Sequence, residues 1–168
     1  FGKEAEQAYV KYYWLRENMQ DHLYSAALEA HETGLPMMQA MVLAFPEETE
    51  LKENETQYQF CDTMLVSPVI TENARTQKVY FPKGKWYDLW SGKVESGELD
   101  VDAELLKCPV YLKAGTVMPL RMSAGLNWSE PFALEAETLV LAVVPAEHHT
   151  EWTLRSSVED RKRLAVDT

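Results

Sequence analysis

The chain has 168 residues, 46% of them hydrophobic and 26% charged, a composition typical of globular proteins rather than of disordered or membrane-spanning ones. Its formal net charge of −11, with only 16 Lys and Arg residues, argues against nucleic-acid binding, because phosphate contacts need a basic surface. No apolar run approaches the roughly 20 residues that span a bilayer, and the N-terminus has no signal-peptide pattern.

Residues 3–33 are predicted to form one long helix. Gly34 suits the left-handed position that follows a helix, and Pro36 forbids its continuation. About 30 residues is long for a globular helix, so we expect its apolar stripe to pack on a body larger than the remaining chain provides. The stripe recurs at steps of three and four residues and consists of Ala5, Ala8, Tyr9, Tyr12, Leu15, Met19, Leu23, Ala26, Ala27 and Ala30.

After Pro36 the pattern changes to short apolar or alternating runs, which are separated by polar or glycine-containing turns. Several short strands at this spacing predict an antiparallel β-sandwich rather than a parallel α/β sheet. A further strand is predicted at residues 151–155, before a basic patch at residues 161–163. The expected fold class is therefore mostly β with one long N-terminal helix. The predicted strand-bearing runs are MMQAMVLAF, QYQFCDTMLVSPVI, KVYF, KWYDLW, CPVYLKAGTVMPL and TLVLAVV.

Cys61 and Cys108 both lie in apolar, strand-like runs. Two cysteines are too few for a disulfide scaffold, and they lack the spacing of metal ligands. We therefore predict two buried free thiols, with one disulfide as the alternative. The nearby Met37, Met38 and Met41 are interpreted in the same way, as core filler rather than as a metal or partner surface.

Two triplets, Asn54 in NET and Asn127 in NWS, match the pattern of N-glycosylation acceptors. Glycosylation of such a triplet requires passage through the secretory pathway, and the pattern also arises by chance. The sequence therefore leaves two locations open. In the secretory pathway both asparagines would be acceptors, whereas in the cytoplasm neither would be.

Asp88 is the first candidate for catalysis, because it lies between Trp86 and Trp90, an aromatic setting suited to a sugar ring. A retaining glycosidase needs two carboxyl groups about 5 Å apart, and Asp88 has no evident partner in the sequence. The interpretation that we favour is an aromatic-rich strand that ends in a Ser91–Gly92 turn.

His31 and Glu32, at the end of the predicted helix, match only part of a metalloprotease motif, because position 35 holds Leu instead of a second His. A His at a helix C-terminus is favoured by the helix dipole, so an architectural role is expected. His148 and His149 are predicted to lie in an exposed polar loop. The sequence has no nucleophile elbow and no phosphate-binding glycine loop. We therefore predict no catalytic, cofactor-binding or metal-binding residue in this chain.

Four blocks of the sequence resemble, in the same order, the C-terminal part of glycoside hydrolase family 31, the α-glucosidase and α-xylosidase family. LYSAALEAHETGLPMMQAMVLAFP (residues 23–46) resembles the family's last barrel helix and the start of its β-domain. QYQFCDTMLVSPV (57–69), VYFPKGKWYDLWSG (79–92) and CPVYLKAGTVMPL (108–120) resemble the three blocks that follow. The chain from Leu126 onward resembles the family only loosely.

The resemblance implies three domains: residues 1–35 as the last helix of a (β/α)8 barrel, 36–122 as a proximal β-sandwich, and 123–168 as the start of a distal β region. The family's two catalytic Asp residues lie upstream of these blocks, so no catalytic role is transferred to Asp88. No metal or organic cofactor is implied.

Several residues depart from the family's pattern near the junction of helix and sandwich. Cys61 stands where the family usually has Gly, Gln39 where Arg is common, and Ala44 where Glu precedes Phe-Pro. Asp21-His22 replaces a usual Pro-Tyr. The family's Arg and Glu are expected to form ion pairs between barrel and sandwich. Their joint absence is either compensatory or the mark of a repurposed copy.

The function implied by the resemblance is that of the C-terminal segment of a retaining α-glycosidase, which hydrolyses α-glucosides or α-xylosides as an intact enzyme. The catalytic barrel would be the partner of this segment, and the segment alone is expected to be inactive. Because the chain does not begin with Met, we expect it to be part of a longer one. Two alternatives stay open: an assembly subunit that binds through the helix stripe, and a carbohydrate-binding module that uses the faces of Trp86 or Trp128.

Overall fold

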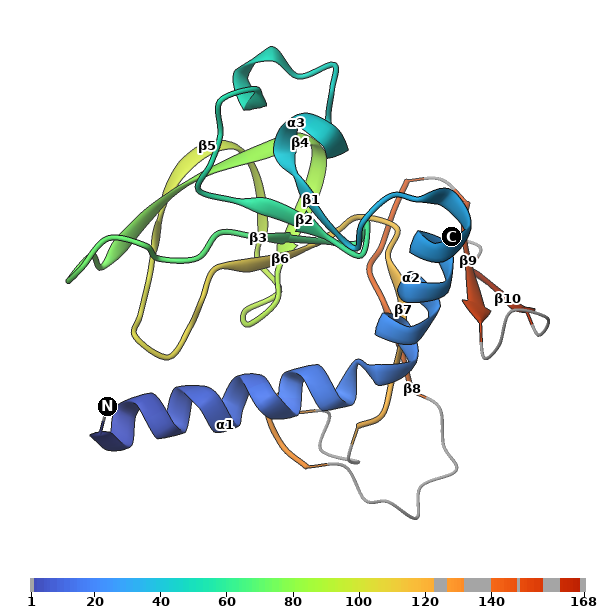
Figure 1. Ribbon diagram of the computed structural model, residues 1–168, viewed down its shortest axis with the longest axis horizontal. Helices are drawn as coiled ribbons and strands as arrows, with labels where there is room; N and C mark the ends of the chain where they lie inside the picture. Colours follow the sequence, from blue (N-terminus) through green and yellow to red (C-terminus); the bar gives the residue numbers. More distant parts are fainter. Residues whose placement is uncertain (1, 123–126, 132–139, 148, 156–160, 167–168) are drawn as a thin grey trace. The chain divides into compact units, whose positions relative to one another are not determined.

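The computed structural model describes residues 2–122, 127–131, 140–147, 149–155 and 161–166 (Figure 1). The chain forms two compact units: unit 1 comprises Phe1–Gly34 and Gly115–Thr168, and unit 2 comprises Leu35–Ala114. The division expected from the family resemblance, into residues 1–35, 36–122 and 123–168, concerns the parts of a larger enzyme and stays a prediction. Among the described residues, no helix combines the length and the apolar character needed to cross a bilayer.

Unit 1 begins with two helices, α1 (Gly2–Asn18) and α2 (Gln20–Thr33), which meet at an angle at Met19 (Figure 1). The prediction of one continuous helix is therefore wrong at this point. In a continuous helix the carbonyl of Asn18 would accept a hydrogen bond from the N–H four residues further on. Instead it accepts one from the backbone N–H of Arg121, at 2.8 Å. A distant segment of the chain thus occupies the acceptor that would have continued the helix.

The side chain of Asn18 strengthens the same break. It is fully buried, and its amide nitrogen donates hydrogen bonds to the backbone carbonyls of Trp128 and Glu130, at 2.9 and 3.1 Å. A buried polar group that satisfies two carbonyls in this way holds the segment at residues 127–131 against the end of α1.

The end of α2 follows the sequence prediction. Gly34 has a φ of 77°, in the left-handed region, and its N–H donates to the carbonyl of Ala30 at 2.9 Å. Glycine adopts this conformation without steric cost, which is why it commonly follows the last turn of a helix. The predicted stop signal is confirmed.

The strands of unit 1 form two antiparallel pairs. β7 (Val117–Leu120) pairs with β8 (Val140–Val143), and β9 (Thr150–Arg155) pairs with β10 (Arg161–Val166). β9 contains the strand that was predicted at residues 151–155. The predicted basic patch lies in β10, whose first residue pairs with Arg155.

Helix α2 packs on β9 through specific contacts. The ring of His22 stacks on that of Trp152, with centroids 5.3 Å apart and planes inclined by 29°. The hydroxyl of Ser25 donates to the carbonyl of Arg155 at 3.2 Å and accepts from its N–H at 2.9 Å. The guanidinium of Arg155 also forms an ion pair with Glu32, at 2.8 Å. These contacts join the second half of the N-terminal segment to the C-terminal strands.

Unit 2 is built on one antiparallel sheet of six strands in the order β1-β2-β3-β6-β4-β5 (Figure 1). The antiparallel β character predicted from the sequence is confirmed and is consistent with a β-sandwich domain. A four-residue helix α3 (Met41–Ala44) and a 3-10 turn η1 (Thr49–Leu51) connect β1 to β2. The strands are β1 (Met38–Ala40), β2 (Tyr58–Phe60), β3 (Met64–Val66), β4 (Thr76–Asp88), β5 (Val94–Asp102) and β6 (Val110–Lys113).

Two elements of this sheet differ from the sequence prediction. The runs KVYF and KWYDLW were expected as separate strands, but β4 runs without a break from Thr76 through KVYF to Asp88 within KWYDLW. The pairing of β4 with β5 shifts register between Phe81 and Trp86, and Gly84 in this stretch has a φ of 124°, so the turn-like residues form an irregularity within one strand. β5 was not predicted at all, because its composition is polar.

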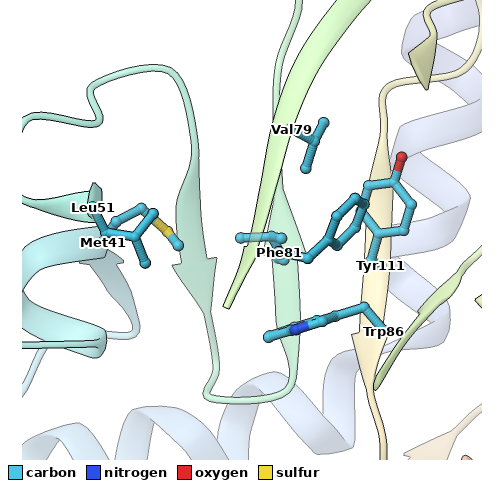
Figure 2. Close-up of a cluster of buried hydrophobic side chains, with 7 residues drawn as sticks. Met41, Leu51, Val79, Phe81, Trp86 and Tyr111 are labelled. Carbon is cyan, nitrogen blue, oxygen red and sulfur yellow. The ribbon is translucent and has the colours of Figure 1, made fainter. Parts of the chain in front are cut away.

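The core of unit 2 lies around Trp86, which is completely buried (Figure 2). Its ring meets that of Phe45 edge-on at 6.3 Å, and its indole N–H donates to the carbonyl of Pro82 at 2.8 Å. Phe81 and Tyr111 form a second edge-to-face pair at 4.7 Å. The core cluster consists of Met41, Leu51, Leu65, Val79, Phe81, Trp86 and Tyr111.

Of the three methionines interpreted as core filler, Met41 is fully buried in this cluster, but the prediction is wrong for Met38, which is 57% exposed. Met37 is half-buried. Met38 begins the edge strand β1, which pairs with a neighbour on one side only. Cys61 and Cys108 are free thiols, as predicted, but only Cys61 is buried, whereas Cys108 is half-buried.

Candidate functional site

Unit 2 contains a cleft of about 540 Å³ between the end of β4, the hairpin strand β5 and the loop that leads into β6. Asp88 and Trp90, which the sequence had singled out, both line it. The cleft also brings in residues that sequence reasoning missed, among them Lys93, Glu95 and Leu99. The spacing of Leu99 and Val101 at a period of two residues, in a largely polar stretch, is the signal that could have revealed this strand and its cleft residues.

The carboxylate of Asp88 is used to close a turn at the end of β4. Its Oδ1 accepts hydrogen bonds from the backbone N–H groups of Trp90 and Ser91, at 3.1 and 2.7 Å, and from the Ser91 hydroxyl at 2.7 Å. Backbone bonds of this kind are typical of an Asp that terminates a strand in a turn. The geometry therefore supports the interpretation of WYDLWSG as a strand that ends in a turn.

The two tryptophans that flank Asp88 have different surroundings. Trp86 is completely buried, so its face cannot meet a ligand, and the alternative that used Trp86 as a sugar-binding surface is wrong. Trp90 is half-buried and lines the cleft, and its indole N–H donates to the carbonyl of Cys108 at 2.9 Å. The bond fixes the ring of Trp90 between the turn after β4 and the loop before β6.

Two of the residues that line the cleft, Tyr111 and Cys108, carry groups that stay protonated at neutral pH. Burial and the charges of Asp88 and Glu95 raise the pKa of Tyr111 well above its usual range, so its hydroxyl stays protonated. Burial raises the pKa of the Cys108 thiol to about 11, which leaves almost no thiolate at neutral pH. The cleft thus holds charges and hydrogen-bonding groups but no activated cysteine nucleophile.

The described histidines that were predicted to be architectural or exposed show no constellation suited to chemistry. His31 is exposed in the last turn of α2, and its neighbour Glu32 bonds Arg155. His149 is exposed and lies 3.0 Å from the carboxylate of Glu151, whereas His148 lies outside the described residues. In the part of the chain that the structure describes, no three His, Cys, Asp or Glu side chains are grouped closely enough to hold a metal ion.

Two of the departures from the family's pattern, Cys61 and Gln39, have surroundings that the structure describes. Cys61 and the following Asp62 both have a positive φ, of 52° and 55°, which explains physically why a glycine suits the first of these positions. Gln39 is buried and donates to Oδ1 of Asp62 at 3.3 Å. Gln39 thus has a carboxylate partner within unit 2.

The substituted pair Asp21-His22 also has partners, both within unit 1. Asp21 receives two hydrogen bonds from the guanidinium of Arg121, at 2.8 and 3.0 Å, in a bidentate arrangement. His22 is buried against Trp152, and burial lowers its pKa from 6.5 to about 4. Asp21 and His22 thus both contact residues from the C-terminal part of unit 1.

The two glycosylation triplets have hydrogen-bonded asparagines. Oδ1 of Asn54 accepts from the N–H and the hydroxyl of Thr56, at 3.2 and 3.4 Å. Asn127 is exposed; its amide donates to Glu130 at 2.8 Å, and its Oδ1 accepts from the N–H of Ser129 at 3.0 Å. Their role as acceptors stays a prediction.

Comparison with known proteins identifies the relatives of this chain. An isomaltosyltransferase from Sporosarcina globispora is 33% identical over 118 residues, which is 69% of this chain and 11% of the relative. An enzyme named alpha-glucosidase 2 from Bacillus thermoamyloliquefaciens is 33% identical over 122 residues, or 71% of this chain and 16% of the relative. The chain thus spans less than a fifth of the length of each.

Comparison of the fold with solved structures also finds carbohydrate-active enzymes. The structure of a cycloalternan-forming enzyme from Listeria monocytogenes, solved with a pentasaccharide substrate, superposes with a TM-score of 0.89 at 27% identity, over 96% of this chain and 16% of that one. Residues 34–118 match the family described as the glycosyl hydrolase family 31 C-terminal domain. By sequence and by fold, this chain belongs to glycosyl hydrolase family 31, with residues 34–118 forming the C-terminal domain of that family.

Proposed function

We propose that this chain is the supporting C-terminal segment of a retaining family 31 α-glycosidase and supplies none of its catalytic carboxylates. The observation that carries the proposal is the match of residues 34–118 to the family's C-terminal domain. The low share of the relatives that the chain covers, 11% and 16%, supports a catalytic barrel elsewhere in the intact protein. This barrel is the proposed partner of the segment.

The bonding of Asp88 supports the absence of a catalytic carboxylate. A nucleophile or an acid/base carboxyl must be free to meet the sugar, and a retaining pair lies about 5–5.5 Å apart. One oxygen of Asp88 accepts three hydrogen bonds within its own turn. Its role in the proposed enzyme is to end β4.

Helices α1 and α2 are the proposed last helical segment of the barrel. Only Leu15 and Asn18 of α1 are buried within the described part of the chain. Tyr9 and Tyr13 are 73% and 43% exposed and stack on each other at 6.5 Å. Large aromatic side chains gain free energy from burial, so this exposed pair is suited to packing against a neighbouring helix or strand of the barrel.

The proposed reaction of the intact enzyme is hydrolysis of α-glucosides or α-xylosides with retention of configuration. An Asp of the barrel would form a covalent glycosyl-enzyme, which water then cleaves. The residues of this chain contribute no proton transfer and no bond to the sugar in that reaction. Their contribution is the buried core of unit 2, which gives the barrel a rigid neighbour.

The proposal is tested by assaying this chain and the full-length protein side by side on 4-nitrophenyl α-glucoside and α-xyloside. We expect the chain alone to release no nitrophenol above the uncatalysed rate and the full-length protein to turn over at least one substrate. Turnover by the purified chain alone would refute the proposal. Inactivity of the full-length protein on an extended panel of α-glycosides would refute its enzymatic part.

The assembly-subunit alternative makes a different prediction about the native protein. If a barrel precedes residue 1 in the same polypeptide, the intact mass exceeds that of the 19.3 kDa chain several-fold. If the chain is a separate subunit, its native mass stays near this value, and it co-purifies with a partner other than a barrel. Mass spectrometry of the native protein distinguishes the two.

For the glycosylation triplets we propose that Asn127 is the better acceptor, because it is exposed whereas Asn54 is half-buried. Secretion of the chain from a eukaryotic host, followed by glycan removal and peptide mass analysis, tests both sites. An unmodified Asn127 in the secreted chain would contradict the proposal.

A further inference from the structure

We propose that the cleft of unit 2 is a binding site for a neutral saccharide. In this site Trp90 and Leu99 meet the apolar face of a sugar ring, and Glu95 and Lys93 bond its hydroxyl groups. The proposal does not depend on the function proposed above, because every residue that it uses lies within unit 2.

The dimensions and the apolar wall of the cleft fit such a ligand. Its volume of about 540 Å³ lies within the range of roughly 300–1,000 Å³ that is usual for small-ligand sites in proteins. Trp90, Leu99, Val101 and Pro109 contribute apolar surface to the lining. A pyranose ring has C–H groups on its faces and hydroxyls around its edge, so it matches a site with one aromatic-apolar side and one polar side.

The charges of the lining select against other ligand classes. Five acidic residues face two basic ones, so the lining carries a formal net charge of −3 and repels phosphates and sugar acids. A metal ion is not favoured either, because no metal-binding group of side chains occurs among the described residues. The charged lining residues are Asp88, Glu95, Asp100, Asp102, Glu104, Lys93 and Lys107.

The polar groups suit hydroxyls, which both donate and accept hydrogen bonds. Glu95 forms an ion pair with Lys93 at 2.6 Å, and only 13% of the Glu95 side chain is exposed. A second pair among the lining residues joins Glu104 and Lys107, at 2.8 Å. A sugar hydroxyl can donate to the carboxylate of such a pair and accept from its ammonium group. Hydrogen bonds to a partly buried charge are stronger than those made in open solvent.

The decisive experiment is an NMR titration of the ¹⁵N-labelled chain with three glucose trisaccharides: maltotriose, isomaltotriose and cellotriose. We expect millimolar binding of at least one of them, with shifts confined to the amides of residues 88–111 and to the indole N–H of Trp90. Glucose 6-phosphate should bind more weakly than glucose, because of the negative lining. If no trisaccharide shifts these signals at 50 mM, or if the phosphate binds as well as glucose, the proposal is refuted.

A matched pair of variants on β5 tests the polar contact. Glu95→Gln removes the carboxylate that lines the cleft, and Glu98→Gln removes one that also pairs with a lysine, Lys78, but does not line the cleft. We expect Glu95→Gln to weaken binding about tenfold, the loss typical of a charge-assisted hydrogen bond, and Glu98→Gln to leave it unchanged. Equal effects of the two variants would overturn the assignment.

A second pair keeps the proposal testable if Glu95→Gln does not fold. Leu99 and Leu105 are both exposed, at 38% and 57%, so neither is needed for the core, but only Leu99 lines the cleft. Leu99→Gln should weaken saccharide binding several-fold, whereas Leu105→Gln should not. Unchanged binding by Leu99→Gln would refute the proposed contact with the sugar face.

Discussion

The backbone N–H of Arg121 donates a hydrogen bond of 2.8 Å to the carbonyl of Asn18, at the residue where α1 ends. The bond joins residues 103 positions apart in the sequence, and it takes the place of the helical bond that would have carried α1 into α2. The bond thereby joins the two segments of unit 1, Phe1–Gly34 and Gly115–Thr168.

Replacing Asn18 by Ala should destabilise unit 1. Asn18 is completely buried, and the change leaves the carbonyls of Trp128 and Glu130 without their donor. We expect the free energy of unfolding to fall by about 1–3 kcal/mol. Urea denaturation followed by far-UV circular dichroism measures the change. The exposed Asn127→Ala serves as the control and should stay within about 0.5 kcal/mol of the unchanged chain. Equal effects would contradict the role of the Asn18 amide.

His22 should make stability fall in mildly acidic solution. Burial lowers its pKa from 6.5 to about 4, so between these pH values the unfolded chain binds a proton that the folded chain does not. The stabilisation is fully present above pH 6.5, decreases as the pH falls, and is lost by about pH 4. The shift corresponds to about 3 kcal/mol in the free energy of unfolding.

The measurement is urea denaturation at pH 7, 5.5 and 4.5, in the unchanged chain, in His22→Gln and in the exposed-site control His31→Gln. The slope of stability against pH should become shallower in His22→Gln only, because both variants keep the same carboxylates. If His31→Gln alters the slope as much as His22→Gln, the assignment to His22 is wrong.

Cys61 should tolerate a β-branched residue poorly. Its φ of 52° lies in the left-handed region, where an L side chain costs roughly 1–2 kcal/mol and a β-branched one is a genuine outlier. Cys61→Val should therefore lower the free energy of unfolding by at least about 1 kcal/mol more than Cys108→Val, since Cys108 has no positive φ. Thermal and urea denaturation of the two variants give the comparison. Equal losses would show that the backbone at Cys61 relaxes without cost.

Gln57 should be a strong determinant of the stability of unit 2. Its side-chain amide donates to the carbonyl of Tyr80 at 2.7 Å, and its oxygen accepts from the N–H of Tyr80 at 3.0 Å. The side chain thus makes the pair of bonds that a neighbouring strand would make. Gln57→Ala should cost about 1–3 kcal/mol, because both backbone groups lose their partner.

The control for Gln57 is Gln77, a half-buried glutamine near the start of β4, whose side-chain amide donates a weak hydrogen bond of 3.5 Å to the Lys78 carbonyl. Gln77→Ala should change the free energy of unfolding by less than about 0.5 kcal/mol. Amide hydrogen exchange at Tyr80 gives an independent readout. Slow exchange that persists in Gln57→Ala would contradict the proposed pairing.

The sequence predicted best those features that are determined by neighbouring residues. The helix stop at Gly34 follows from the conformational freedom of glycine, and the antiparallel strands follow from short alternating runs. The break at Met19 depends instead on Arg121, which no local pattern reveals. The residues on both sides of Met19 favour a helix, and the hydrogen bond from Arg121 outweighs that preference.

The candidate site was predictable only in part, for a related reason. Asp88 and Trp90 stood out because an acid between tryptophans is unusual, but Glu95, Leu99 and Lys107 join them only through the pairing of β4 with β5 and through the loop before β6. β5 itself was missed because four of its nine residues are acidic, a composition that indicates a loop. Its strand conformation comes from pairing with β4.

The acidity of β5 has a consequence for how unit 2 meets other molecules. β5 and β1 are the two outer strands of the sheet, where backbone N–H and C=O groups lack a second strand. Exposed edge strands of this kind can pair with strands of further chains, and this pairing leads to aggregation. β1 is only three residues long, and β5 carries Glu95, Glu98, Asp100 and Asp102, whose charges repel a second copy of the same strand. The polar composition that hides β5 from sequence reasoning is thus what keeps this border of the sheet from self-association.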